Sequence, residues 1–244
     1  MSQPAVSALA PLPFDLVYSD GEPLDNEWHT WQFPLLRDQI FDAMVERGEK
    51  DFYVGGDMFV YHSRKQAEDV ARGKPYFRGP DVFWVGGVAP RPRKCWVAWE
   101  EGGRLPDVII ELLSPSTAEI DRTEKRDLYA RVFRTKEYYL YEPETRAWEG
   151  LGLAGLAYQP MVPDEHGRFW SEQLGVYLGL WHGVVGHIED DWVRVFRADG
   201  SLVPTAEERA EAERQRAKAA EERAKAAEAE LARLRALLAE RGPG

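Results

Sequence analysis

The most informative part of the sequence is Leu105-Pro-Asp-Val-Ile-Ile-Glu-Leu-Leu-Ser-Pro-Ser-Thr-Ala-Glu-Ile-Asp-Arg-Thr-Glu-Lys125. It contains an apolar run, residues 108–113, which is followed by Ser114-Pro115. This run is too short for a helix and is rich enough in β-branched residues for a buried strand. Glu111 interrupts it, and a carboxylate inside a core strand is costly unless it is paired or binds a metal. Glu111 is therefore the first candidate for a functional residue.

The residues after Pro115 predict a helix. Two capping boxes could begin it, Ser116 with Glu119 and Asp121 with Glu124. Asp121, Lys125 and Tyr129 are spaced four apart and share one helical face. The strand therefore leads into a helix that brings an ammonium group back toward Glu111.

A second strand is predicted upstream, in residues 79–85, with Asp81 at its mouth. Two acids on neighbouring strands and one lysine form a pattern suited to metal-dependent hydrolysis of phosphodiesters. The acids hold a divalent cation that lowers the pKa of bound water, and the lysine orients that water and offsets phosphate charge. The pattern predicts a nuclease.

The chain resembles the PD-(D/E)XK, or restriction-endonuclease-like, nuclease superfamily, and within it the Uma-two family of predicted endonucleases. The resemblance covers roughly residues 15–205 and is most specific from Glu111 to Tyr129. The matching words are Gly56-Asp-Met-Phe-Val-Tyr61, Gly79-Pro-Asp-Val-Phe83, Pro106-Asp-Val-Ile-Ile-Glu-Leu-Leu-Ser-Pro-Ser-Thr117, Asp121, Lys125, Tyr129 and Glu137-Tyr-Tyr-Leu-Tyr-Glu-Pro143.

The resemblance implies a mixed sheet flanked by helices and cleavage of nucleic acid, with DNA as the expected substrate. Asp81 and Glu111 would bind Mg²⁺ or Mn²⁺, helped by the main-chain carbonyl of Leu112. The chain departs from the superfamily pattern at Leu113, where a lysine is expected. The resemblance implies that Lys125 has taken over that role.

Other polar residues near this pattern receive lesser roles. Ser114 and Asp121 are expected to support or cap the site, and Tyr129 is expected to pack in the core. A carboxylate on the first helix helps to bind a second metal in many nucleases of the superfamily. We leave Glu27, Glu46 and the nearby His29 out of the site, because a surface or capping role accounts for them.

Composition agrees with one sizeable core. The chain has 244 residues, 44% of them hydrophobic, and a single cysteine, Cys95, which excludes an internal disulfide framework and a zinc site made of cysteines. No apolar run reaches membrane-spanning length. We therefore expect a soluble, cytoplasmic protein.

The net charge of −11 argues against a nucleic-acid partner. Nine acids and nine bases follow residue 203, so the whole deficit lies before it. Residues 64–94 nevertheless hold eight bases against three acids and bracket Asp81. Two interpretations stay open for this run, a rim that follows phosphates and a pair of solvated loops. Trp96 and Trp99 are likewise read as cover for the sheet or as stacking partners for bases.

Residues 1–13 are read as a flexible arm, and residues 14–203 as one α/β nuclease-like domain. Within the domain, the first helix is predicted over 34–48, with Leu36, Ile40, Phe41, Met44 and Val45 on one face. Further strands are predicted at 51–62 with a break at Gly55-Gly56, at 95–99, at 136–142 and from 147. Residues 150–203 are predicted to form hairpins that complete the sheet edge.

Residues 204–244 are rich in Ala, Glu and Arg and predict a helical tail that begins with a Thr205–Glu208 capping box. Ten positions, spaced alternately by four and three, form a heptad seam: 206, 210, 213, 217, 220, 224, 227, 231, 234 and 238. All are Ala or Leu except Glu213. The seam predicts a coiled coil and a homodimer. The alternative is a single charged helix held by ion pairs between neighbouring turns.

The sequence thus predicts a Mg²⁺- or Mn²⁺-dependent endonuclease whose catalytic residues are Asp81, Glu111 and Lys125. The alternative is an inactive nuclease fold that serves as a dimerising module binding nucleic acid or protein. The acidic surface and the displaced lysine favour the alternative, whereas three retained charges favour the enzyme. The strandedness and sequence of the substrate are not encoded in any recognisable motif.

Overall fold

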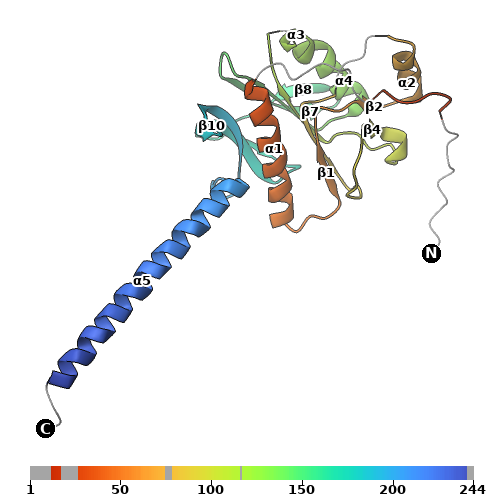
Figure 1. Ribbon diagram of the computed structural model, residues 1–244. Helices are drawn as coiled ribbons and strands as arrows, with labels where there is room; N and C mark the ends of the chain where they lie inside the picture. The colour runs from red at the N-terminus through yellow and green to blue at the C-terminus, as the bar shows by residue number, and fades with distance from the viewer. Residues whose placement is uncertain (1–11, 18–26, 75–78, 116, 241–244) are drawn as a thin grey trace. The chain divides into compact units, whose positions relative to one another are not determined.

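The computed structural model describes residues 12–17, 27–74, 79–115 and 117–240, the last five of these without their side chains. Its centre is a six-stranded mixed sheet in the order β1-β3-β5-β6-β7-β8 (Figure 1). The strands are β1 (Phe52–Gly55), β3 (Val82–Gly86), β5 (Val108–Leu112), β6 (Glu137–Glu142), β7 (Ala147–Ala154) and β8 (Ala157–Pro160). β5 and β6 run parallel, and the other neighbouring pairs run antiparallel. The predicted α/β class with a mixed sheet is confirmed.

Three later strands form a separate antiparallel sheet: β9 (Phe169–Ser171), β10 (Val176–Val185) and β11 (Ile188–Phe196). The prediction that residues 150–203 complete the edge of the main sheet is therefore correct for β8 and wrong for β9 to β11. Phe169, Leu178 and Val193 point into the same hydrophobic cluster as the first helix. The second sheet thus packs against the cluster that contains α1 and does not extend the edge of the main sheet. A short parallel pair, β2 (Val60–Tyr61) with β4 (Trp96–Val97), confirms the middle of the strand predicted over 95–99, while Ala98 and Trp99 lie in a 3₁₀ turn instead.

The first helix, α1 (Glu27–Glu46), starts earlier than predicted and contains Pro34. A proline inside a helix removes one backbone hydrogen bond, which is why the pattern suggested a start at residue 34. Packing holds the first turn instead, since Trp28 and His29 are both buried.

Only part of the predicted apolar face of α1 is buried. Leu36, Ile40 and Met44 are in the core as expected. Phe41 and Val45 are 51% and 53% exposed, so their assignment to the buried face is wrong. Each follows a buried residue directly, and a step of one residue turns the side chain by about 100° around the helix axis.

The helix after β5 is continuous but irregular. It consists of α3 (Ala118–Ile120), a π-helical segment η2 (Asp121–Lys125), α4 (Arg126–Leu128) and a second π-helical segment η3 (Tyr129–Phe133). Ser116, one of the two predicted N-caps, lies outside the described residues. Asp121, the other, lies within the helix and is not a cap. π-Helical turns are rare and occur often at functional sites.

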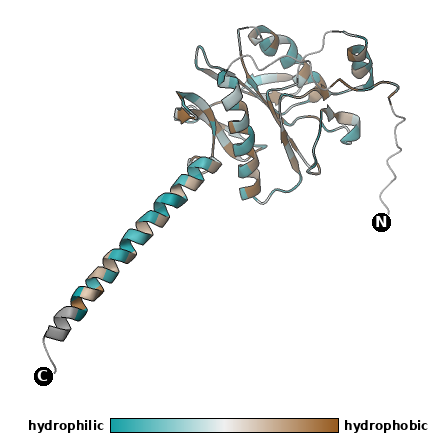
Figure 2. Cartoon of the chain, in the orientation of Figure 1, coloured by the Kyte–Doolittle hydropathy of each residue, from teal (hydrophilic) through white to brown (hydrophobic). Residues whose placement is uncertain are grey.

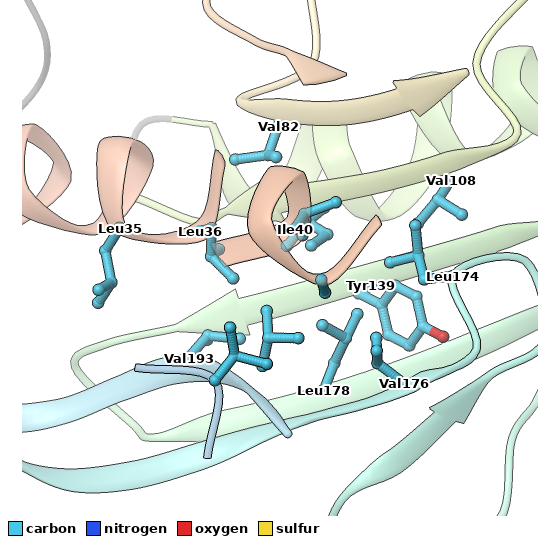
Figure 3. Packing of buried hydrophobic residues seen from close by; sticks show 14 of the residues in the cluster. Leu35, Leu36, Ile40, Val82, Val108, Tyr139, Leu174, Val176, Leu178 and Val193 are labelled. Carbon is cyan, nitrogen blue, oxygen red and sulfur yellow. The ribbon is translucent and has the colours of Figure 1, made fainter. Parts of the chain in front are cut away.

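β5 and β6 are apolar on both faces, and their side chains alternate between two core clusters. Val108, Ile110 and Leu112 join the cluster that contains α1 and the second sheet, part of which Figure 3 shows. Ile109 and Leu113 join the cluster that contains the helix after β5. Because side chains alternate along a strand, Glu111 faces that helix. Two short elements precede β5 in the chain: a helix, α2 (Arg64–Ala71), and a 3₁₀ turn, η1 (Ala98–Glu100).

The chain divides into two compact units, Met1–Val203 and Pro204–Gly244. The second unit contains one long helix, α5 (Ala206–Glu240). Its predicted capping box is confirmed, because the Thr205 N–H donates to Oε2 of Glu208 at 2.7 Å and the Glu208 N–H donates to Oγ1 of Thr205 at 3.1 Å. None of the helices in the described part of the chain is long and apolar enough to cross a membrane.

Candidate active site

Asp81 and Glu111 meet at the pairing of β3 with β5. Val82 lies opposite Ile110 in the antiparallel register, which places Asp81 opposite Glu111 one residue further on. The N–H of Asp81 donates to Oε2 of Glu111 at 3.2 Å. The N–H of Leu112 donates to Oδ2 of Asp81 at 2.6 Å. The two acids predicted from the sequence are therefore neighbours.

Two glycines allow the chain to approach Asp81 closely. A Cβ atom at Gly56 would lie 1.9 Å from the carbonyl oxygen of Asp81, and one at Gly79 would lie 1.4 Å from the carbonyl oxygen of Met58. Asp57 has a positive φ of 47° and its N–H donates to the carbonyl of Pro80 at 3.1 Å. The segments around Gly56 and Gly79 thus pack against each other. Asp57 is a turn residue whose main-chain hydrogen bond links the first segment to the second.

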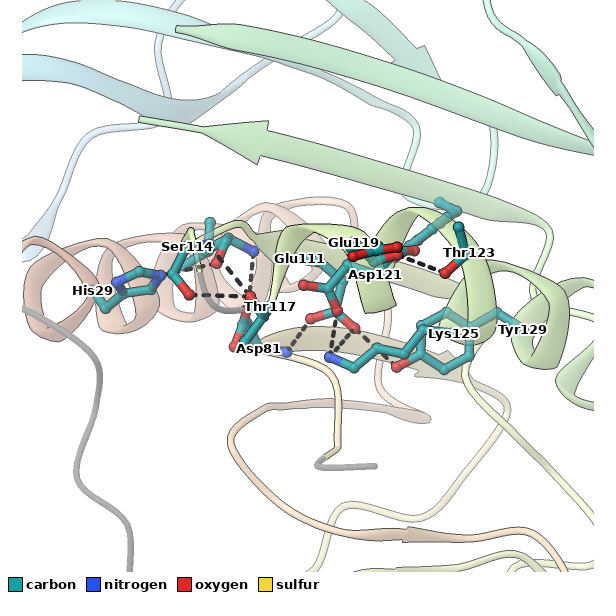
Figure 4. Close-up of polar contacts among 12 residues, drawn as sticks. His29, Asp81, Glu111, Ser114, Thr117, Glu119, Asp121, Thr123, Lys125 and Tyr129 are labelled. Atoms are coloured by element: carbon teal, nitrogen blue, oxygen red, sulfur yellow. Dashed lines mark hydrogen bonds and ion pairs between the residues drawn. The ribbon is translucent and has the colours of Figure 1, made fainter. Parts of the chain in front are cut away.

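The helix after β5 brings a buried lysine to Glu111 (Figure 4). Nζ of Lys125 lies 3.1 Å from Oε1 of Glu111 and 2.7 Å from Oδ1 of Asp121. Glu111, Asp121 and Lys125 are 0%, 1% and 7% exposed. The predicted return of the ammonium group toward Glu111 is confirmed, and Asp121 binds the lysine.

Tyr129 does more than pack. Its hydroxyl donates to Oε1 of Glu111 at 2.8 Å, so the assignment of this residue to packing alone is wrong. The hydroxyl of Tyr138, on β6, donates to the main-chain carbonyl of Asp121 at 2.9 Å. The four-residue spacing of Asp121, Lys125 and Tyr129 could have indicated this contact, since all three share the face that meets Glu111.

His29 also belongs to the site. Its Nε2 lies 2.9 Å from the carbonyl oxygen of Leu112, and because a carbonyl can only accept, the ring carries its proton on Nε2. The two residues are 83 positions apart, and no local pattern around His29 predicts the contact. Ser114 contributes to the turn after β5, where its N–H donates to Oγ1 of Thr117 at 3.3 Å. The supporting role expected for Ser114 agrees with this contact.

Burial controls the ionisation of these groups. It raises the pKa of Asp81 and the pKa of Glu111, and Lys125 only partly offsets this effect. Burial also lowers the pKa of the Lys125 ammonium group, but the carboxylates of Glu111 and Asp121 outweigh burial and raise it. Lys125 therefore stays protonated. Asp81 and Glu111, whose pKa values are raised, favour binding of a proton or another cation.

The donor set suits a hard divalent cation. Three carboxylates, on Asp81, Glu111 and Asp121, surround one ammonium group, so the fully ionised cluster carries two excess negative charges. Oδ1 of Asp81 makes no hydrogen bond or ion pair within the described part of the chain. Among the described residues, no group of three or more His, Cys, Asp and Glu side chains could by itself hold a metal ion. Mg²⁺, however, commonly binds one or two carboxylates and keeps several waters.

The basic run at 64–94 is only partly available for phosphates. The guanidinium group of Arg93 binds Glu101 at 2.8 Å and lies over the rings of Tyr53 and Trp96 at 4.6 and 4.9 Å. The Arg93 side chain is 2% exposed, so a phosphate contact by this residue is excluded. Arg91 also binds Glu101. Trp96 is fully buried, which confirms its role as cover for the sheet.

The mixed sheet and its buried acid–lysine cluster are consistent with the restriction-endonuclease-like nuclease superfamily. A family model described as "Uma2: putative restriction endonuclease" matches residues 14–188, more than half of the chain. The chain therefore belongs to the Uma2 family, and this membership indicates a nuclease that acts on nucleic acid. No curated protein matches the chain.

Proposed function

We propose that the protein is a metal-dependent endonuclease that hydrolyses phosphodiester bonds in DNA. Asp81, Glu111 and Lys125 would be its catalytic residues. The observation that supports this proposal best is the buried ion pair between Lys125 and Glu111 at 3.1 Å, beside Asp81 on the neighbouring strand. Buried charges cost stability, so a purely structural core would replace them with apolar side chains.

Asp81 and Glu111 are the residues that would hold Mg²⁺ or Mn²⁺, together with the main-chain carbonyl of Leu112. When bound, such a cation lowers the pKa of a coordinated water and offsets charge on the phosphate. His29 already uses one lone pair of the Leu112 carbonyl and leaves the second for a ligand. We therefore infer that His29 fixes the orientation of this carbonyl.

Lys125 would position the attacking water and offset phosphate charge. Its relocation from position 113 is supported by packing, because Leu113 faces the same side of β5 as Glu111 and belongs to the cluster that contains Tyr129 and Ala130. A lysine at 113 and a lysine on the facing helix would therefore approach the cluster from the same side of the sheet.

The proposal is tested by cleavage of plasmid DNA in Mn²⁺. Asp81→Asn and Glu111→Gln should each abolish cleavage, because each removes a carboxylate from the proposed cation site. Glu137→Gln is the matched control, since Glu137 is also a buried glutamate but lies on β6 in contact with Ser171 and Tyr139. Cleavage by either site variant at the wild-type rate would refute the assignment of these acids.

A second candidate function is a catalytically inactive module that binds nucleic acid or protein. The net charge of −11 favours it, and so does the engagement of Arg91 and Arg93 by Glu101. An inactive module should bind its partner without divalent ions and cleave nothing in their presence. Titration of the wild-type protein with Mn²⁺ separates the two candidates, because the module has no use for the cation.

We propose further that residues 14–203 are the catalytic domain and that α5 pairs with a second copy as a coiled coil, giving a homodimer. The seam positions support this pairing, since exposed leucines in a heptad pattern are usually covered by a partner helix. Sedimentation of the full chain should give a dimer. A monomeric mass at micromolar concentration would favour the single charged helix. We also propose that the protein is cytoplasmic, as a DNA substrate would require.

A further inference from the structure

α5 presents an apolar seam to solvent. In heptad notation the seam residues alternate between d (206, 213, 220, 227, 234) and a (210, 217, 224, 231, 238). All side chains from 211 to 235 are exposed, and Leu231 and Leu234 are among the exposed large hydrophobic residues. Figure 2 shows α5 as mostly hydrophilic, with its strongest hydrophobic colour near its C-terminal end. A surface of this kind fits another helix with the same repeat.

The charges beside the seam identify that helix. In a parallel, in-register pair, each g residue faces the e residue five positions later on the other chain. Three of the resulting pairs are of opposite charge: Arg216 with Glu221, Arg223 with Glu228, and Glu230 with Arg235. Within the described residues, Glu221 pairs with Lys225 and Glu230 pairs with Arg233, and both cations are exposed. The seam is thus flanked by charges that complement a second copy of itself.

One segment departs from this pattern and supports the same register. Arg209 would face Arg214 of the second copy, which is unfavourable, but the seam residue between them is Glu213. A side chain at d packs beside the e position of the partner helix, so Glu213 would meet Arg214 of the second copy. In this alignment the charge of Glu213 would therefore offset the repulsion between Arg209 and Arg214.

The leucines select the parallel direction. They occupy the last three seam positions, 231, 234 and 238, whereas the first seven are Ala or Glu. An antiparallel pair with matched ends would set leucine against alanine or Glu213. A parallel pair sets leucine against leucine and buries more apolar area in one place.

We propose that two copies of the chain pair through α5 as a parallel, in-register coiled coil. The 204–244 unit follows the catalytic unit in the chain, so both catalytic units join the same end of the coiled coil. This inference rests on the proposed function for its consequence, which is that two nuclease sites are delivered together to the two strands of one duplex. The pairing itself does not depend on nuclease activity.

Disulfide cross-linking of the full chain tests the direction and register. In a Cys95→Ser background, Ala217→Cys and Ala227→Cys are made separately, and Lys218→Cys, at the outward b position, is the control. Both seam variants should form covalent dimers rapidly in a mild redox buffer, and the control should form far fewer. An antiparallel pair can bring one seam position onto itself but not two that lie about 15 Å apart along the helix. Failure of either seam variant to cross-link would overturn the proposal.

Charge reversal tests the e and g pairs. Arg216→Glu with Arg223→Glu places acid against acid, and Glu221→Arg with Glu228→Arg places base against base. Each double variant alone should dimerise about tenfold more weakly than the wild-type chain, and an equimolar mixture should recover the wild-type affinity. An unchanged affinity in the separate variants, or no recovery in the mixture, would contradict the proposed pairs. Neither experiment needs metal or substrate, so loss of the nuclease proposal would leave both results valid.

Discussion

Replacement of Lys125 by methionine separates the lysine's contribution to stability from its contribution to catalysis. The change keeps the apolar stem and removes the ammonium group that lies 3.1 Å from Glu111 and 2.7 Å from Asp121. Removing one partner of a buried ion pair costs about 3–5 kcal/mol. Proton uptake by the remaining carboxyls should limit the cost to about 3 kcal/mol, which in a domain of this size lowers Tm by about 6–12 °C.

The same variant should regain stability in Mn²⁺ and lose activity. A divalent cation bound to Asp81 and Glu111 supplies the positive charge that Lys125 no longer supplies, so Mn²⁺ should raise the Tm of Lys125→Met more than that of the wild-type protein. DNA cleavage in Mn²⁺ should fall at least about a hundredfold. Lys136→Met is the matched control, because Lys136 is 55% exposed and pairs with Asp107 at the surface. A Lys125→Met protein that cleaves DNA at the wild-type rate would refute the relocation of the lysine.

Three other changes test particular contacts. Tyr129→Phe removes the hydrogen bond to Glu111 and should lower the free energy of unfolding by about 2 kcal/mol in a urea titration. Arg93→Gln should cost about 3 kcal/mol by the same measurement and leave the salt dependence of DNA binding unchanged, because Arg93 is buried against Glu101. Burial raises the pKa of Glu137, so the folded chain keeps this proton where the unfolded chain has lost it, and this contribution to stability is lost as pH rises through the raised pKa. Glu137→Gln should therefore flatten the fall in stability between the ordinary glutamate pKa and neutral pH, and an unchanged slope would assign that fall to other groups.

The strand and helix around Glu111 could be predicted because local chemistry determines them. β-Branched residues before Glu111, leucines after it and the Ser114-Pro115 stop define β5, and the four-residue spacing after it defines the face that carries Lys125. The sequence also indicated that Asp81 would lie beside Glu111. Strand pairing then placed the two acids opposite each other.

Long-range packing explains what the sequence did not reveal. The start of α1 depends on the burial of Trp28 and His29 against residues far along the chain, so the position of Pro34 misled the prediction. The second sheet has the same short apolar pieces and turns as an edge hairpin would have. Only its packing against α1 distinguishes the two arrangements.

The contacts of Tyr129 and Arg93 were missed for a related reason. An aromatic residue on a buried helical face is usually core, so Tyr129 was assigned to packing although its spacing from Lys125 places it on the face that meets Glu111. A basic run is usually solvated or bound to phosphate. Glu101, the acid that neutralises Arg93, follows β4 and η1 in the chain. Its contact with Arg93 is recognised only in the folded chain.

Binding of a divalent cation by Asp81 and Glu111 can be measured by calorimetric titration with Mn²⁺. The wild-type protein and the Glu137→Gln control should bind Mn²⁺, while Asp81→Asn and Glu111→Gln should each bind it at least about tenfold more weakly. A wild-type protein that binds no Mn²⁺, or site variants that bind it as tightly as the wild-type protein does, would show that these two acids are not a cation site.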